Sequence, residues 1–110
     1  MTPQSRRAGG ASQGEDQVAR LADAVAAAVR RCSGVARLAA GPVATYLSGR
    51  RVPGVAVRGD EVRVVVVARY GPPLSQVAAD VRAAVRQVDP ELRVEVVIED
   101  IDLPASDTRP

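Results

Sequence analysis

Apolar residues recur at helical spacing in two stretches of the chain, which predicts two amphipathic helices. Ser12 and Glu15 have the spacing of a capping box, and Gly34 suits a left-handed stop, so we expect the first helix to lie between them. Its apolar stripe comprises Val18, Leu21, Ala22, Val25, Ala28, Val29 and Cys32. The second stripe, which ends at Asp89-Pro90, comprises Leu74, Val77, Ala78, Val81, Ala84, Val85 and Val88.

Alternation of apolar and polar residues predicts strands between and after the helices. Residues 55–58 and 61–70 alternate on either side of Gly59-Asp60, which is typical of an antiparallel hairpin. The segments "VARLA" and "VATYL" are candidate short strands, and "RVEVVIE" is a final strand. The order predicts a two-layer α+β domain, with both helices on one face of a small mixed or antiparallel sheet.

The chain length and its polar ends predict a single domain. At 110 residues the chain fits one hydrophobic core without disulfides or metals. Residues 1–12 and 104–110 offer little to bury, so we expect disordered tails there and one α+β domain over residues 13–103. We expect a cytoplasmic protein without direct membrane insertion, because no run approaches the ~18 to 20 apolar residues that span a bilayer and the first residues do not resemble a signal peptide.

The composition argues against most catalytic chemistry. The sequence has no histidine and a single cysteine, so it lacks the usual acid–base residue and the usual zinc ligands. We interpret Cys32 as a structural thiol because it falls on the first apolar stripe. Glu99, Asp100 and Asp102 are a possible site for a hard cation, but a solvated strand end is the favoured interpretation. We therefore predict a protein that is not an enzyme, with no catalytic, cofactor-binding or metal-binding residues.

The sheet face turned away from the helices is the first candidate site, called here the outer sheet face. If Val62, Val64 and Val66 face the helices, strand alternation turns the intervening residues outward. The predicted interaction residues are Ala56, Arg58, Arg63, Val65, Val67, Arg69, Glu95 and Val97. An apolar centre within a charged rim is typical of a protein-binding patch. The patch is small, on the order of 300 Å² against roughly 800 Å² per partner in a standard interface, and coverage by residues 38–48 is the alternative.

The segment "SGRRVPG" is the second candidate site. Arg50 and Arg51, between Gly49 and Gly54, could contact the phosphates of a nucleic acid. Single-strand recognition usually stacks bases on aromatic rings, and the sequence has only two tyrosines and no other aromatic residue. All 15 basic residues are arginines, a bias that looks like the mark of a GC-rich genome and weakens the argument from charge. A solvated turn is therefore the favoured interpretation of this segment.

Three segments resemble, in order, the alkaline shock protein family of envelope stress response proteins. They are "QVARLADAVAAAVRRCSGVARLA", "GVAVRGDEVRVVVVARYGPPLSQVAADVRAAVR" and "LRVEVVIEDI", and "YLSGRRVPGV" looks like the actinobacterial version. The resemblance covers roughly residues 16–102, although the chain has Asp89-Pro90-Glu91 where a glycine is expected before the last strand. It implies a non-enzymatic cytoplasmic protein that forms homo-oligomers and is held near the membrane by a membrane-anchored partner protein. It implies no catalytic residues.

Overall fold

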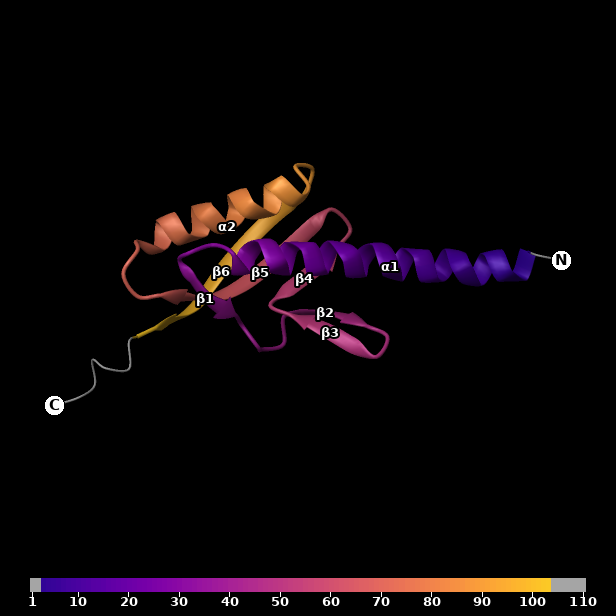
Figure 1. The fold of residues 1–110 in the computed structure, drawn as a ribbon, viewed down its shortest axis with the longest axis horizontal. Coiled ribbons are helices and arrows are strands. Elements are labelled where there is room, and N and C mark those ends of the chain that lie inside the picture. Colours follow the sequence, from indigo (N-terminus) through magenta and orange to yellow (C-terminus); the bar gives the residue numbers. More distant parts are fainter. Residues whose placement is uncertain (1–2, 104–110) are drawn as a thin grey trace.

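The computed structural model describes residues 3–103, and the side chains of residues 3–13 lie outside that description. Figure 1 shows the arrangement of its two helices and six strands. The elements in chain order are α1 (Pro3–Arg30), β1 (Val35–Leu38), β2 (Ala44–Leu47), β3 (Arg50–Pro53), β4 (Val55–Arg58), β5 (Glu61–Arg69), α2 (Leu74–Val88) and β6 (Arg93–Asp102).

Strand β5 is the centre of a four-stranded mixed sheet. β6 runs parallel to β5 along its whole length, from the pair Glu61 and Arg93 to the pair Arg69 and Asp102. The other edge of β5 is shared: β4 pairs antiparallel with its first half, and β1 pairs antiparallel with its second half. The predicted hairpin is therefore confirmed, with Gly59 in its turn at a φ of 60°.

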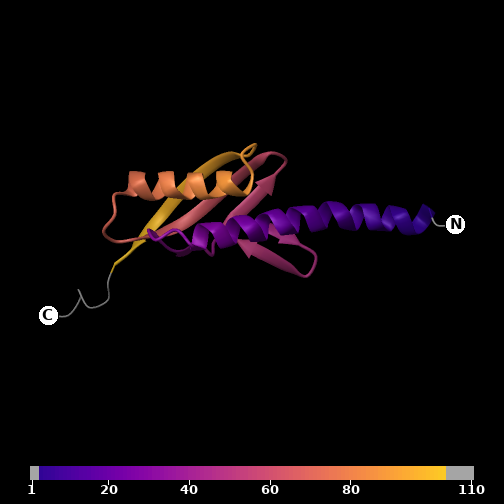
Figure 2. The ribbon, with the colours of Figure 1, turned by 45° about the horizontal axis from the view of Figure 1, so that its top comes forward.

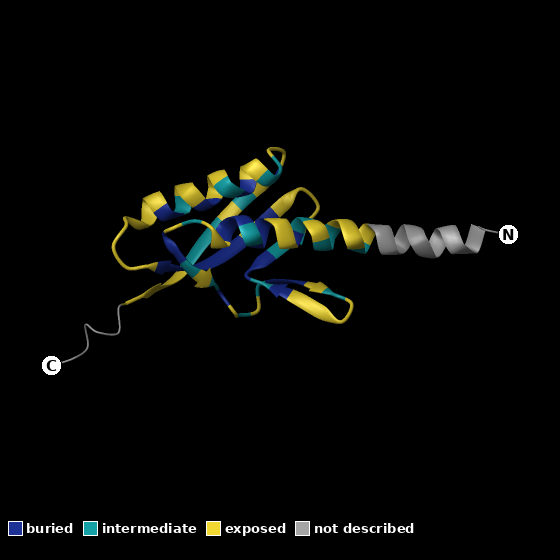
Figure 3. Ribbon diagram, viewed as in Figure 1, coloured by how far each residue is buried: buried dark blue, intermediate teal, exposed yellow. Residues whose placement is uncertain are grey.

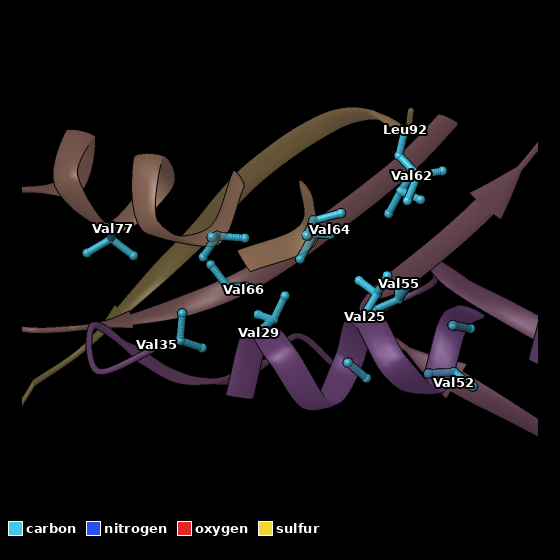
Figure 4. Close-up of a cluster of buried hydrophobic side chains, with 14 of the residues drawn as sticks. Val25, Val29, Val35, Val52, Val55, Val62, Val64, Val66, Val77 and Leu92 are labelled. Atoms are coloured by element: carbon cyan, nitrogen blue, oxygen red, sulfur yellow. The ribbon is translucent and has the colours of Figure 1, made fainter. Parts of the chain in front are cut away.

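Both helices cover the same face of this sheet and run side by side in opposite directions (Figures 1 and 2). Val64 and Val66 on β5 are fully buried beneath them, together with Val29 on α1 and Val81 on α2. Figure 4 shows Val29, Val64 and Val66 meeting between the helices and the strands. The chain has no Phe or Trp, so the core is built from closely packed Val and Ala side chains. This arrangement confirms the predicted α+β class and the assignment of the inward face.

Helix α1 differs from the prediction at both of its ends. It begins at Pro3 instead of near Ser12, and an existing helix is extended at little cost per residue. Gly34 is not among the glycines with a positive φ. A Cβ atom there would lie 2.8 Å from Val77 Cγ2, so Gly34 is needed for close packing of the chain against α2. Within the predicted tails, residues 1, 2 and 104–110 lie outside the described residues.

The segment predicted as a turn around Arg50 and Arg51 is instead strand β3. It pairs antiparallel with β2 in a separate two-stranded sheet, with Gly49 at the turn. Gly54 then connects β3 to β4 at a φ of 79°, and a Cβ atom there would lie 2.8 Å from Leu38 Cβ. This β2–β3 hairpin lies beside α1, away from α2 (Figure 1). Alternation predicted β2, but the arginines and Pro53 obscured β3.

Candidate interaction surface

The outer sheet face carries rows of cross-strand neighbours drawn from β4, β5 and β6. One row joins Ala56, Arg63 and Glu95, and the row beside it joins Arg58, Glu61 and Arg93. Arg63 pairs with Glu95 across 2.9 Å, and Arg93 pairs with Glu61 across the same distance. The predicted residues Ala56, Arg58, Arg63 and Glu95 are therefore brought together at one end of this face, where charged side chains alternate in sign.

The predicted apolar centre of the outer sheet face is not exposed, and this part of the prediction is wrong. Val65 is 6% exposed and Val67 is 4% exposed within a single chain, and Figure 3 shows β5 largely in the colour of buried residues. Strand β5 is central and has strand neighbours along both edges, so side chains of adjacent strands flank those of Val65 and Val67. Two other segments of the chain lie close to Val65. Its N–H donates a hydrogen bond to Gly54 O, and its O accepts one from Ala39 N–H. Val97 is half-buried, and Arg69 is exposed at the far end of the face.

A hollow of about 760 Å³ lies at the end of the outer sheet face where Arg58, Arg63 and Arg93 meet Glu61 and Glu95. Its remaining wall comes from the start of the β2–β3 hairpin and its lead-in, with Pro42, Val43, Ala44 and Tyr46. Tyr46 is 64% exposed, and its hydroxyl donates to Pro42 O across 2.9 Å, which fixes the ring at the rim. Alternation along the sequence predicts the residues that form the floor of this hollow. It does not predict the wall, because the wall belongs to the two-stranded sheet of β2 and β3 and to the segment before it.

Arg58 is the cation of the hollow that makes no ion pair among the described residues, whereas Arg63 and Arg93 are each paired. The lining residues Arg58, Arg63 and Arg93 outnumber Glu61 and Glu95 by one charge. An anionic group entering the hollow would therefore meet an unpaired guanidinium beside the apolar surface of Ala56 and Val43. This combination suits a peptide that has an acidic side chain next to an apolar one.

Arg50 and Arg51, the predicted nucleic-acid contacts, are both engaged within the chain. Arg50 donates two hydrogen bonds to the Asp23 carboxylate of α1, at 2.9 Å and 3.3 Å, and this pairing raises the pKa of Arg50. Arg51 donates to the carbonyl oxygens of Ala40 and Gly41. The two guanidinium groups point to different partners, so they do not form a shared phosphate site. Nucleic-acid binding stays a prediction.

Polar contacts that the sequence did not reveal hold the β2–β3 hairpin in place. Glu15 of α1 accepts hydrogen bonds from the backbone N–H and the hydroxyl of Ser48, and these bonds lower the pKa of Glu15. Thr45 is buried, and its hydroxyl donates to Val55 O and accepts from Val57 N–H. These contacts join residues far apart in the chain, so no local pattern predicts them.

Cys32 has the environment of a weakly reactive thiol. Its side chain is half-buried against the core, and its sulfur lies 3.7 Å from the carbonyl oxygens of Ala28 and Asp80. Burial and the nearby Asp80 carboxylate raise the pKa of the Cys32 thiol, which reduces the thiolate that a nucleophile needs. This environment agrees with the structural role predicted for Cys32.

No group of three or more His, Cys, Asp or Glu side chains is arranged to hold a metal ion in the part of the chain whose side chains are described. Neither described helix is long and apolar enough to cross a membrane.

Comparison with known proteins adds no relative to this picture. No protein-family model matches the chain, and no curated protein and no solved structure matches it.

Proposed function

We propose that this protein is a non-catalytic interaction module of the envelope stress type, which self-associates and docks to a membrane-anchored partner protein. The envelope stress assignment rests on the resemblance of the three segments within residues 16–102. The absence of histidine and the raised pKa of the Cys32 thiol favour a binding role over a catalytic one. The single observation that carries the docking role is the hollow on the outer sheet face.

The hollow supports docking of an extended peptide segment better than docking of a broad protein surface. Val65 and Val67 are buried, so the apolar patch expected from the sequence is unavailable. The hollow offers Ala56 and Val43 for an apolar side chain and the unpaired Arg58 for a carboxylate. Short anchors of this kind carry much of the binding energy in small interfaces. The partner segment proposed here is therefore extended and acidic.

Substitutions at the hollow test the docking role. Arg58→Glu and Ala56→Arg change an exposed and a half-buried side chain in the hollow, so both variants should keep the circular dichroism spectrum of the wild type. Fractionation of cells that produce the protein should show that both variants leave the membrane pellet for the supernatant. Arg82→Glu is the matched control, because it reverses an exposed charge on α2, which covers the opposite face of the sheet.

Two results would contradict this proposal. One is a hollow variant that stays in the membrane pellet as fully as the Arg82→Glu control. The other is binding of the purified protein to protein-free vesicles, which would mean that lipid, and no partner protein, holds the chain at the membrane.

A further inference from the structure

Strand β6 forms an open edge of the four-stranded sheet. It is 10 residues long, and among the described strands it pairs with β5 alone. Val94, Val96 and Ile98 pack against the core, yet each stays half-buried because no strand lies beyond them. The strand contains neither Pro nor Lys, and its irregularity against β5 and most of its acidic residues lie beyond Ile98, so residues 93–98 are a regular stretch of open edge. An edge of this length and apolar content is a template for another strand.

The backbone of β6 shows which of its groups are available for pairing. Arg93 N–H donates to Asp60 O across 2.8 Å, so the backbone groups of Arg93 face β5. Successive residues of a strand alternate in direction, so Glu95 and Val97 also face β5, while Val94, Val96 and Ile98 present N–H and C=O groups to the open edge. The outward backbone groups thus belong to the residues whose side chains extend the apolar core.

We infer that a second copy of this chain pairs antiparallel with β6, with Val96 of each copy at the two-fold axis. This register places Val94 opposite Ile98 and Val96 opposite Val96, so the apolar layer beneath the helices continues from one copy into the next. All three residues direct their backbone groups outward, so they meet as hydrogen-bonded pairs. The two sheets become one continuous sheet.

The charges on β6 favour this register. They also favour a second copy of the chain as the partner strand at the open edge. On the other face of the strand, Glu95 of each copy stands opposite Val97 of its partner. The ladder between β5 and β6 passes from the pair of Val66 and Ile98 to the pair of Val67 and Asp100, so Glu99 lies at a bulge. Antiparallel pairing brings the basic start of one strand, at Arg93, close to the acidic end of the other, at Glu99 and Asp100. Neither Glu99 nor Asp100 makes an ion pair among the described residues, whereas Arg93 is paired with Glu61 in its own chain, so pairing of two copies adds a further carboxylate beside Arg93. A register centred on Val97 would bring Glu95 of each copy close to Glu99 of the other, and like charges close to each other across two strands are destabilising.

A shift by one residue is also disfavoured, because it would set apolar side chains of one copy beside charged side chains of the other. This inference rests on the self-association in the proposed function and assigns it to the open edge of β6, which adjoins the hollow at Arg93, Val94 and Glu95. Pairing through one strand buries less than the roughly 1,200 Å² of a small specific interface, so we expect a dissociation constant in the micromolar range.

Val96→Pro tests the backbone pairing. Proline removes an N–H that faces the open edge, so the ladder between β5 and β6 stays intact. Sedimentation velocity should show the wild type as a concentration-dependent dimer, and Val96→Pro should weaken that dimer by at least about tenfold. Val96→Ala is the matched control, because it shortens the same side chain and keeps the N–H. Equal weakening in both variants would contradict strand pairing.

A charge exchange tests the register independently and does not depend on a proline variant that folds. Glu99→Arg places an arginine close to Arg93 of the partner copy, and Arg93→Glu places a glutamate close to Glu99 of the partner copy, so each variant alone should dimerise about tenfold more weakly than the wild type. An equimolar mixture of the two variants should recover the dimer, because each copy then meets opposite charges at both positions. A mixture that stays monomeric would overturn the antiparallel placement that brings Arg93 of one copy close to Glu99 of the other.

These outcomes separate the inference from the proposed function. A wild type that remains monomeric at high concentration overturns the edge pairing and the self-association together. A dimer that survives Val96→Pro but is lost in Arg58→Glu overturns edge pairing and places self-association at the hollow. If the hollow variants lose membrane docking but keep an unchanged dimer, both proposals are supported, and docking and self-association use separate surfaces.

Discussion

The four-stranded sheet and the β2–β3 hairpin are attached to the same helix by different kinds of contact. The larger sheet presents fully buried valines of β5 to both helices. The β2–β3 hairpin contributes one buried valine, Val52, with the small Ala44 and the partly buried Leu47, and it also depends on the Thr45 hydroxyl and the carboxylates of Glu15 and Asp23. Apolar burial is cooperative across the core, whereas exposed polar contacts contribute little each.

We therefore expect the hairpin to open more easily than the four-stranded sheet. Local opening takes place where buried apolar contacts are few. The hairpin and its lead-in supply one wall of the hollow, so opening of the hairpin changes the shape of the proposed docking site without disturbing the main core. The two regions meet at Gly54, so a change there should affect both.

Gly54→Ala should produce the largest effect, because it strains the junction and forces a contact. Gly49→Ala is a matched control: its φ of 81° is close to that of Gly54, but no atom lies within 4 Å of its added Cβ. We expect losses of about 3 kcal/mol in unfolding free energy for Gly54→Ala and about 1 kcal/mol for Gly49→Ala, measured by urea denaturation. Equal losses would show that the close approach to Leu38 is unimportant.

Val64→Ala and Val52→Ala compare the cores of the two regions. Val64→Ala should lower the unfolding free energy by about 2 kcal/mol and quicken amide exchange throughout the protein. Val52→Ala should quicken exchange mainly in β2 and β3, since Val52 anchors only the hairpin. Hydrogen exchange measured residue by residue distinguishes the two patterns. A global effect from Val52→Ala would mean that the hairpin and the main core unfold as one unit.

Thr45→Val removes the buried hydroxyl that joins the hairpin to β4. The carbonyl of Val55 loses its donor, so we expect a loss of about 1 kcal/mol in unfolding free energy. Thr45→Ser keeps the hydroxyl and serves as the control in the same thermal or urea measurement. A Thr45→Val variant as stable as Thr45→Ser would show that the hydroxyl does not hold the hairpin.

The smallest of the expected effects is a sensitivity of the hairpin to acid, which Glu15 should cause. Hydrogen bonds from Ser48 hold the pKa of Glu15 below its ordinary value of 4.5. Because the folded pKa is the lower one, the contribution of these bonds is present above pH 4.5 and is lost as the pH falls through the folded value. The amide shift of Ser48, followed by NMR, should titrate in this range, and Glu15→Gln should abolish that titration. A Ser48 shift that titrates equally in the variant would assign the effect to another group.

The sequence predicted the helix-covered half of the fold well. Two residue spacings, those of a helix and a strand, identify Val25, Val29, Val64, Val66 and Val81 as inward positions, and all of them are buried. Such patterns follow from the local geometry of the backbone, so they can be read without knowledge of distant contacts. The predicted class and order of elements were confirmed for the same reason.

The outer sheet face was predicted less well because exposure depends on distant neighbours. Alternation correctly placed Val65 and Val67 opposite the helices, but it could not show that β1, β4 and β6 would enclose β5. Strand β3 was missed because Arg50 and Arg51 read as solvent-exposed loop residues. Their contacts with Asp23 and the Ala40 and Gly41 carbonyls exist only in the folded chain.

The parallel pairing of β5 with β6 also sets the order in which the protein can be completed during synthesis. β4 and β5 are adjacent in the chain, but the Arg63 and Glu95 side chains that meet across β5 and β6 are 32 residues apart, with α2 between them. A nascent chain that has released α2 from the ribosome still leaves one side of its central strand without a neighbour. Arrested chains that end before Arg93 should therefore be cleaved rapidly by protease, and chains that include all of β6 should resist it.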